Sequence, residues 1–211
     1  MSTQRIAFLG ASRGLGAAVV ALSEMQNVEG LVISRQPKSV NPKIKIFSCD
    51  FAQMQNLELL QQALRGFAPH KLWYFAGGGP YGPFAKKDWK DHHWAWQVSF
   101  VTPAKLLHEA LRGNLGVDLQ QVIMVGSAVA EDKWDIHAAS YAAAKHALKG
   151  LVLSIVEEGC NLDVRLFSPS YMDTELLPSG ASPRQRGADI LDPSAVAQVF
   201  WDWAVSDDGD H

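Results

Sequence analysis

The chain has 211 residues, of which 47% are hydrophobic and 19% are charged, as is ordinary for a soluble globular protein. Its formal net charge of −3 argues against a nucleic acid or an anionic membrane as the main partner. The length suits one domain over residues 1–211, with an acidic end at 206–211 that is expected to fray.

The sequence does not predict export, membrane insertion or metal binding. Its first residues, MSTQRIAFLG, enter a strand-like run directly, and no uncharged apolar stretch reaches the length of a membrane span. The two cysteines, Cys49 and Cys160, suit a reducing compartment, and no cluster has metal-ligand spacing. We therefore expect a cytoplasmic protein without a metal site.

Short apolar runs alternate with helical patterns along the chain. The runs are nearly continuous, as in strands buried on both faces of a parallel sheet, and they cover residues 5–10, 31–34, 44–48, 71–77, 121–127 and 163–169. Helical spacing of apolar residues covers 14–25, 56–65, 93–112, 140–158 and 193–205. This alternation predicts a Rossmann-type doubly wound α/β fold, with three αβα layers and about six parallel strands.

The link between the second and third expected strands, at 35–43, is short and contains two prolines. It is close to the lower limit for a connection between parallel strands, so we expect a loop there and not a helix.

A glycine-rich segment, GASRGLG at 10–16, joins the first expected strand to the first expected helix. Glycine lets the backbone turn sharply and approach a ligand, and the N–H groups of a helix N-terminus attract phosphate. Glycine is common in turns of any fold, but this strand–loop–helix order indicates a dinucleotide site. The residues assigned to that site are Gly10, Ser12, Arg13, Gly14, Leu15 and Gly16.

Two arginines predict which dinucleotide binds. An NAD site often carries an acidic residue after the second strand, where it binds the ribose 2′-hydroxyl. Arg35 stands at that position here, and Arg13 lies in the glycine loop. Either arginine alone could be a solvated surface residue, but two guanidiniums suit a 2′-phosphate. We therefore expect NADP(H) in preference to NAD(H).

Tyr141 and Lys145 lie in the alanine-rich run SYAAAKHALKG. Residues at i and i+4 share a helix face, so the phenol and the ammonium should lie one turn apart. Chance alone would give such a pair in roughly one of five chains of this composition. Ser127, at the carboxyl end of the fifth expected strand, stands where open α/β sheets bind their ligands, which makes chance a poor explanation.

These motifs, GxxxGxG, then serine, then YxxxK, follow the order and nearly the spacing of the short-chain dehydrogenase/reductase family. The chain resembles that family from Gly10 to about Thr174. The resemblance implies that Tyr141 exchanges a proton with the substrate oxygen, that Lys145 binds the nicotinamide ribose, and that Ser127 orients the carbonyl. It also implies that the ammonium lowers the pKa of the phenol from its ordinary value of about 10.

The same resemblance implies cofactor contacts outside the glycine loop. Asp50 matches the acid that recognises adenine, with Phe51 beside it, although a surface acid is the alternative. The stretch PSYMDT is similar to the family's PGxxxT segment, which meets the nicotinamide carboxamide and the pyrophosphate. This stretch would contribute Pro169, Met172 and Thr174 to the cofactor site. The segment after the fourth strand would contribute Ala76, Gly77 and Gly78.

Several positions depart from the family pattern. The family's NNAG reads YFAG at 74–77, so both asparagines are absent. Ser99 replaces the active-site asparagine that helps to hold a water on the proton path, and we include this serine among the catalytic residues. The chain stops after the 193–205 helix, so six strands are expected where relatives have seven.

The residues together predict an NADP(H)-dependent oxidoreductase. It would transfer a hydride between nicotinamide and the carbonyl or alcohol of a small, hydrophobic substrate. The alternative is a cofactor-binding sensor or structural protein with little or no turnover, but such a protein has no need of Ser127, Tyr141 and Lys145 together. An epimerase or dehydratase of the longer related family would need a larger carboxyl-terminal domain than 175–211 provides.

The expected substrate pocket is apolar and aromatic. Segments 78–90, 128–139 and 172–191 would supply Pro80, Tyr81, Phe84, Trp134, Ile136, His137, Tyr171, Met172, Leu176 and Leu177. The glycines and prolines at 177–187 are typical of a mobile lid. We expect its Arg184 and Arg186 to be solvated and not to bind an anionic substrate.

The helices at 93–112 and 140–158 match the dimer interface of the family. The second helix carries apolar residues on more than one face, which fits burial on both sides. We therefore expect a homodimer.

Overall fold

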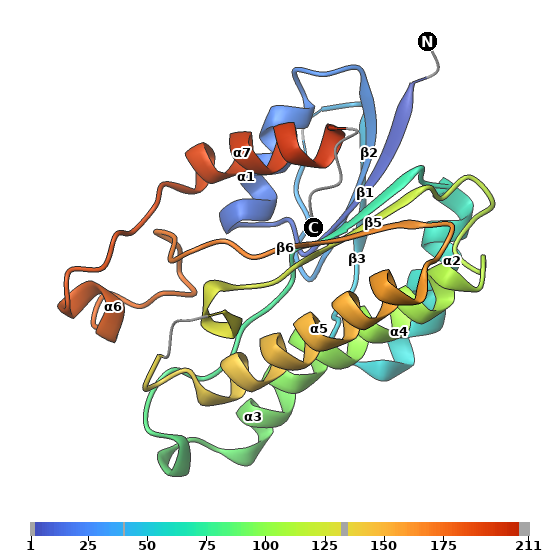
Figure 1. Cartoon of the computed structure of the whole chain (residues 1–211). Helices are drawn as coiled ribbons and strands as arrows, with labels where there is room; N and C mark the ends of the chain where they lie inside the picture. The colour runs from blue at the N-terminus through green and yellow to red at the C-terminus, as the bar shows by residue number, and fades with distance from the viewer. Residues whose placement is uncertain (1–2, 40, 132–134, 207–211) are drawn as a thin grey trace.

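Six parallel strands form the middle layer of the computed structural model, which describes residues 3–39, 41–131 and 135–206 (Figure 1). Their order across the sheet is β3-β2-β1-β4-β5-β6. The strands are β1 (Gln4–Leu9), β2 (Val28–Ser34), β3 (Ile44–Ser48), β4 (Lys71–Tyr74), β5 (Gln121–Val125) and β6 (Asp163–Phe167). The predicted Rossmann-type, doubly wound fold with six strands is confirmed.

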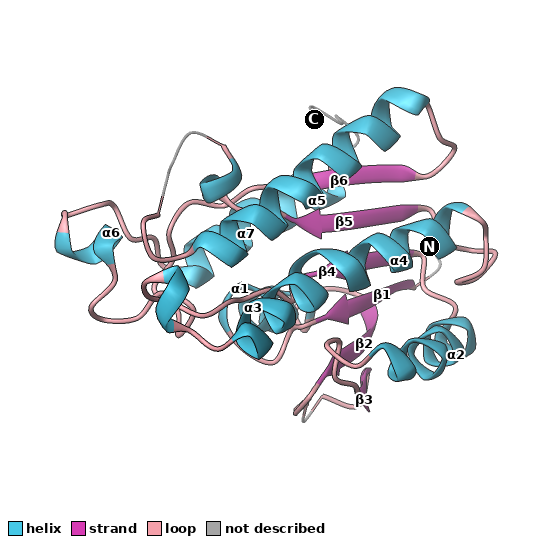
Figure 2. Ribbon diagram, turned by 90° about the horizontal axis from the view of Figure 1, so that it is seen from below, coloured by secondary structure: helices cyan, strands magenta, loops and turns pink. Residues whose placement is uncertain are grey.

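Helices cover both faces of this sheet (Figure 2). One apolar core joins the sheet to α1 (Gly14–Ser23) and α7 (Pro193–Val205). The other core joins the opposite face to α2 (Leu57–Phe67), α4 (Thr102–Leu111) and α5 (Ala139–Glu158). Two further helices are α3 (Trp89–Trp96) and the short α6 (Ser182–Gln185).

The helix expected at 93–112 is longer and contains an irregular turn. Helices α3 and α4 are joined by a π-helical turn at Gln97–Val101. Such turns insert one extra residue into the helix and often occur at functional sites. The turn places Ser99 in the protein interior, fully shielded from solvent.

Three other local expectations differ from the structure. Strand β3 is largely exposed and not buried on both faces, because it forms the edge of the sheet with β2 as its neighbour. The apolar runs at 71–77 and 121–127 leave the sheet at Tyr74 and Val125. Helix α6 was not predicted, because its four residues are too few to show a helical period. The described residues of the link at 35–43 form neither helix nor strand, as expected.

Trp73 anchors α7 to the sheet. Its side chain is completely buried in β4, and its ring meets Phe8, Phe200 and Trp201 edge-on at centroid distances of 5.2–5.5 Å. Edge-to-face aromatic pairs of this kind stabilise a core beyond simple area burial. At its start, α7 is capped by Asp192, whose carboxylate accepts hydrogen bonds from the N–H groups of Ser194 and Ala195.

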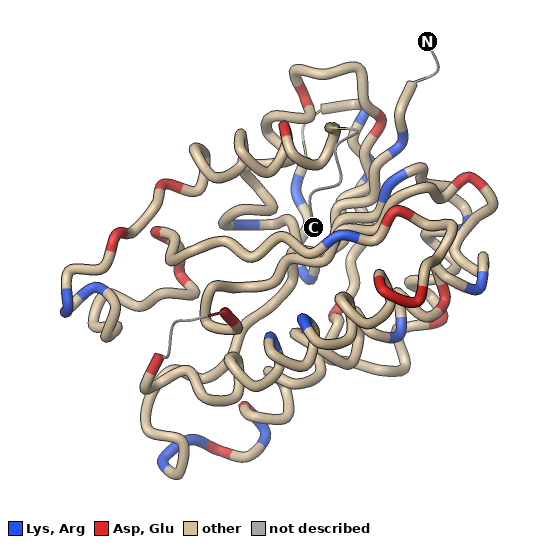
Figure 3. The backbone as a smooth tube through the Cα atoms, viewed as in Figure 1, with Lys and Arg blue, Asp and Glu red and all other residues tan. Residues whose placement is uncertain are grey.

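The surface carries charges of both signs. Figure 3 shows lysines and arginines intermingled with aspartates and glutamates along the described part of the chain. Within that part, no helix is long and apolar enough to cross a membrane. Because all strands are parallel, the carboxyl ends of β1, β4 and β5 meet at one edge of the sheet, and the residues that follow them build the site.

Candidate active site

The glycine loop packs tightly against the segment that follows β4. Gly10 has a positive φ of 82°, and a Cβ there would lie 2.4 Å from the backbone nitrogen of Ala76. Gly14 also has a positive φ, of 57°, and a Cβ on Gly16 would lie 2.7 Å from the Cα of Ala11. All three positions therefore require glycine, for conformational or steric reasons.

The start of α1 is open to an anion. The residue before the helix, Arg13, makes no side-chain capping hydrogen bond. The first N–H groups of a helix have no partner within the helix, and the helix dipole makes that end positive. The loop and the helix start thus have the shape and the donors that a pyrophosphate needs.

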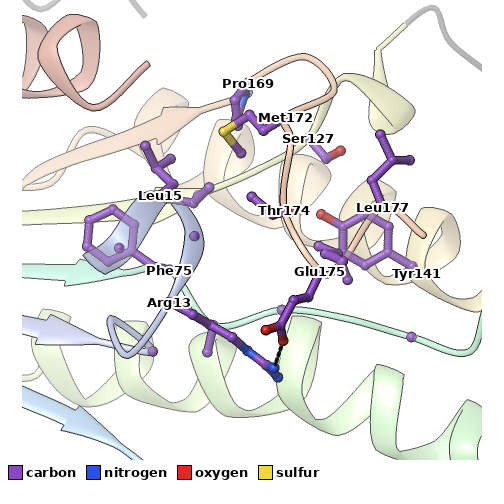
Figure 4. A pocket seen from close by; sticks show the side chains of 18 of the residues that line it. Arg13, Leu15, Phe75, Ser127, Tyr141, Pro169, Met172, Thr174, Glu175 and Leu177 are labelled. Carbon is purple, nitrogen blue, oxygen red and sulfur yellow. Dashed lines mark hydrogen bonds and ion pairs between the residues drawn. The ribbon is translucent and has the colours of Figure 1, made fainter. Parts of the chain in front are cut away.

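A cavity of about 560 Å³ extends from the glycine loop to Tyr141 (Figure 4). This volume lies within the usual range for a small-molecule site. The structure brings to this cavity all of the predicted site residues except Gly78 and Ser99. They are Gly10, Ser12, Arg13, Gly14, Leu15, Gly16, Arg35, Asp50, Phe51, Ala76, Gly77, Ser127, Tyr141, Lys145, Pro169, Met172 and Thr174.

Tyr141 and Lys145 share one face of α5, at the end of the cavity away from the glycine loop. The Lys145 ammonium donates a hydrogen bond to the carbonyl oxygen of Val125 at 2.6 Å, and lies 5.6 Å from the centroid of the Tyr141 ring. Ser127 begins the short turn at Ala128–Ala130, and Figure 4 shows its side chain near the Tyr141 phenol.

Burial controls the protonation of this pair. Burial raises the pKa of Tyr141 above its ordinary value, and hydrogen bonding by the Ser127 hydroxyl offsets part of that rise. Burial also lowers the pKa of Lys145 to about 7, because a charged ammonium is costly in the protein interior. Burial and the Ser127 hydrogen bond are thus the causes of the shift in the Tyr141 pKa, and the lowering of this pKa by the Lys145 ammonium stays a prediction.

Ser99 holds the wall of the cavity instead of lining it. Its hydroxyl accepts a hydrogen bond from the Gly78 N–H at 3.0 Å and donates one to the Gly78 carbonyl at 3.1 Å. Gly78 is turned away in the same manner, and a Cβ on it would lie 2.8 Å from the Trp94 ring. Ser99 thus positions the loop after β4. A Cβ on Gly77 would lie 3.6 Å from the Ser99 hydroxyl and 3.1 Å from the Lys145 ammonium, and the role of Ser99 among the catalytic residues stays a prediction.

The two arginines at the glycine-loop end have partners that the sequence did not suggest. Arg13 forms an ion pair with Glu175, drawn as a dashed line in Figure 4. The Arg35 guanidinium lies 5.9 Å from the centroid of the Trp94 ring, a cation–π distance. Glu175 and Trp94 also line the cavity. Their contacts join segments far apart in the sequence, which no local pattern reveals.

The substrate end of the cavity is largely as predicted. It includes six of the expected residues: Pro80, Tyr81, Tyr171, Met172, Leu176 and Leu177. Three others do not line the cavity. Phe84 stacks on the His92 ring at 4.3 Å, Ile136 is exposed to solvent, and His137 packs edge-on against Tyr81. Trp134 lies outside the described residues.

Arg184 and Arg186 are fastened within the segment expected to form a lid. Arg184 donates a hydrogen bond to the Asp173 carboxylate at 2.6 Å and two to the Leu177 carbonyl. Arg186 donates to the Tyr171 hydroxyl at 3.1 Å. Neither arginine lines the cavity. Their hydrogen bonds hold the segment expected to form a lid against Tyr171 and Asp173.

Sequence reasoning missed one charged residue at the substrate end. Asp135 lines the cavity and is 9% exposed. It lies inside the predicted segment 128–139, in which the residues predicted to line the pocket are Trp134, Ile136 and His137. Its position between Ser127 and Tyr141 in the sequence is the signal that could have predicted a place beside the catalytic residues.

Comparisons with known proteins agree with this architecture. A family model described as short chain dehydrogenase matches residues 4–184. Among curated proteins, no sequence matches this chain. A 4-hydroxyisoleucine dehydrogenase complexed with NADH has a TM-score of 0.83 at 20% identity, over 97% of this chain and 91% of that one.

Two other solved structures are similar to the same extent. A short-chain dehydrogenase/reductase from Vibrio parahaemolyticus has a TM-score of 0.80 at 21% identity, over 98% of this chain and 92% of that one. BdcA in complex with NADPH has a TM-score of 0.78 at 19% identity, over 95% and 87% of the two chains. At these identities the likeness establishes the fold.

The low pKa of Lys145 predicts a pH-dependent stability. Between its folded pKa of about 7 and its ordinary value of 10.5, the unfolded chain binds one more proton than the folded chain. The free energy of unfolding should therefore rise with pH over this window, by at most about 1.4 kcal/mol per pH unit from this group. Urea unfolding at pH 7–9.5 should show a steeper rise in the wild type than in Lys145→Met. Parallel curves would contradict the burial argument.

Proposed function

Because the chain belongs to the short-chain dehydrogenase family, we propose that it is an NADP(H)-dependent oxidoreductase. It transfers a hydride between nicotinamide and the carbonyl or alcohol of a small, mainly hydrophobic substrate. One observation carries the proposal: Ser127, Tyr141 and Lys145 meet at one end of a cavity whose other end is the glycine loop.

The residues along the cavity fit a nicotinamide dinucleotide. Its pyrophosphate would lie at the glycine loop, where side chains are excluded and the start of α1 offers N–H groups. Asp50 and Phe51 would meet its adenine, and Thr174, beside Gly14, would meet its pyrophosphate. When bound, this group supplies or accepts the hydride.

The protein's own part in the reaction is to move a proton and to hold the substrate. Tyr141 donates a proton to the substrate oxygen in the reductive direction, since a phenol whose pKa is raised by burial stays protonated at neutral pH. Ser127 binds the same oxygen and orients the carbonyl. Lys145 binds the nicotinamide ribose, and Ser99 keeps the adjoining loop in place through Gly78.

Removing the Tyr141 hydroxyl tests this function. We expect Tyr141→Phe to reduce carbonyl turnover by about 10²- to 10⁴-fold, the usual contribution of a positioned proton donor. NADPH oxidation across a panel of aldehydes and ketones measures the effect, and quenching of protein fluorescence measures cofactor binding, which should persist.

Tyr74→Phe is the matched control. It removes the same atom from a buried tyrosine that does not line the cavity and whose hydroxyl binds the Val98 carbonyl. Tight NADPH binding by the wild type without reduction of any carbonyl would favour the alternative, a cofactor sensor with the same fold.

We further propose that the cofactor is NADP(H) in preference to NAD(H). Arg13 and Arg35 both line the glycine-loop end of the cavity, and no acid stands at the end of β2. The Arg13–Glu175 pair is mostly exposed, so it contributes little stability and yields readily to a phosphate. The contact between Arg35 and Trp94 leaves the N–H groups of the guanidinium available to the same phosphate.

Arg35→Ala separates the two cofactors. A charge-assisted contact with the 2′-phosphate predicts a fall of about 10- to 100-fold in kcat/KM for NADPH, with little change for NADH. Initial rates with each cofactor, at a fixed carbonyl concentration, measure the two values. Arg65→Ala, on the exposed surface of α2, is the control. An equal loss with NADH and NADPH would refute the assignment.

We also propose that two copies associate through the helical layer that contains α4 and α5. Leu153 on α5 and Trp96 at the end of α3 are apolar side chains that remain 40% and 38% exposed. A second copy would cover such residues. Light scattering at micromolar concentration should give twice the mass of one chain. Leu153→Glu should shift it toward a monomer, whereas Val199→Glu, on α7 across the sheet, should not; a monomeric wild type would reject this interface.

A further inference from the structure

Asp135 is a buried carboxylate on the wall of the cavity, shortly before α5 in the chain. Only 9% of the residue is exposed. An aspartate is rarely buried to this degree without a partner, because removing a carboxylate from water is costly. The hydrogen-bond partners of its two carboxylate oxygens therefore indicate whether the residue has a structural role or binds a ligand.

One oxygen of Asp135 is fully engaged. Its Oδ1 accepts a hydrogen bond from the Tyr81 hydroxyl at 2.9 Å and another from the His137 N–H at 3.3 Å. Within the described part of the chain, no hydrogen bond or ion pair reaches Oδ2. This oxygen is not among the fully buried side-chain atoms that lack a partner, so it keeps access to solvent at the cavity that Asp135 lines. A ligand that fills the cavity would remove that solvent, and a donor on the ligand would then have to replace it.

The hydrogen bonds around Tyr81 fix the direction of this carboxylate. The Tyr81 hydroxyl accepts a hydrogen bond from the Ser182 N–H at 2.8 Å, so its single proton is given to Asp135. The Tyr81 ring packs in the same apolar cluster as Tyr141. Asp135 is thereby held beside the substrate end of the cavity and away from the glycine loop.

Two other carboxylates that line the cavity are neutralised by arginines. Asp173 pairs with Arg184, and Glu175 pairs with Arg13. Asp135 makes no ion pair with any residue that the structure describes. A cation on the substrate would therefore meet a negative charge that no described residue compensates, beside the apolar and aromatic residues at this end of the cavity.

We propose that Asp135 determines substrate specificity by binding an ammonium group on the substrate, with a hydroxyl group as the weaker alternative. The proposal rests on the proposed function and refines it. The preferred substrate is a carbonyl compound with an apolar body and a separate amine, whose carbonyl lies at Ser127 and Tyr141. A site with a buried acceptor rejects an analogue that lacks the matching donor, because the acceptor is then left unpaired.

Matched acetophenones test this inference on the cofactor-bound protein. Each carries ethyl, hydroxymethyl or aminomethyl at the meta or para position, so that size changes little while charge changes; a carboxymethyl member, larger by about two heavy atoms, reverses the charge. We expect kcat/KM for the better aminomethyl isomer to exceed that for its ethyl analogue by roughly tenfold or more, mainly through KM. The carboxymethyl ketone should be the poorest of the series.

Asp135→Asn is the decisive variant, because asparagine keeps an acceptor for Tyr81 while it loses the charge. We expect the aminomethyl-to-ethyl ratio to fall toward one in this variant. Asp173→Asn is the matched control, a lining carboxylate that is already paired, and it should retain the ratio. A wild-type ratio near one for both isomers, or an unchanged ratio in Asp135→Asn, would overturn the proposal while leaving the proposed function intact.

A binding measurement separates this inference from failure of the proposed function. If none of the ketones is reduced, the oxidoreductase proposal falls, and thermal shifts of the NADPH-bound protein with the same compounds still test Asp135. Greater stabilisation by the aminomethyl compound than by the ethyl compound, lost in Asp135→Asn, would support the inference. Equal stabilisation by the two compounds would refute it.

Discussion

The contact between Gly10 and Ala76 is the constraint on which the rest of the site depends. A side chain at Gly10 would collide with the backbone after β4, so the glycine loop can lie against that segment only because it has no Cβ there. This contact fixes one wall of the cavity where the parallel strands end. From Ala76 the same segment continues past Lys145 and reaches Gly78, which Ser99 holds from behind. The cofactor end and the catalytic end are therefore parts of one stretch of backbone.

Most of the fold was predictable from the sequence, because buried parallel strands and amphipathic helices leave strong periodic signals. The same signals could not place the ends of the strands. The apolar runs continue through Phe75 and Gly126, which leave the sheet to line the cavity. Strand β3 reads as a buried strand, yet its exposure follows from its place at the sheet edge, which only the topology determines.

The residues of the candidate site could be predicted where a local motif identifies them. Their burial and their partners could not, because contacts between distant segments determine both. The glycine loop, Ser127, Tyr141 and Lys145 were identified by type and spacing, and the structure brings them to one cavity. The burial that raises the pKa of Tyr141 depends on the whole fold, so the i+4 lysine alone could not reveal it. Ser99 reads as a substitute for an asparagine, but its place behind the cavity wall, on the π-helical turn and bonded to Gly78, could not be predicted from the sequence.

The segment at 169–177 provides a physical link between cofactor and substrate. Near its middle, Thr174 faces the glycine loop: a Cβ on Gly14 would lie 3.3 Å from its methyl group. The next residue, Glu175, pairs with Arg13 (Figure 4). Tyr171 and Leu177 pack with Tyr81 and Tyr141 at the substrate end. The pair with Arg13 is thus one attachment of this segment, and the apolar cluster is the other. The segment that shapes the apolar end of the cavity is therefore fastened to the glycine loop at one point and to the apolar cluster at another, so that ligands at either end meet the same short stretch of chain.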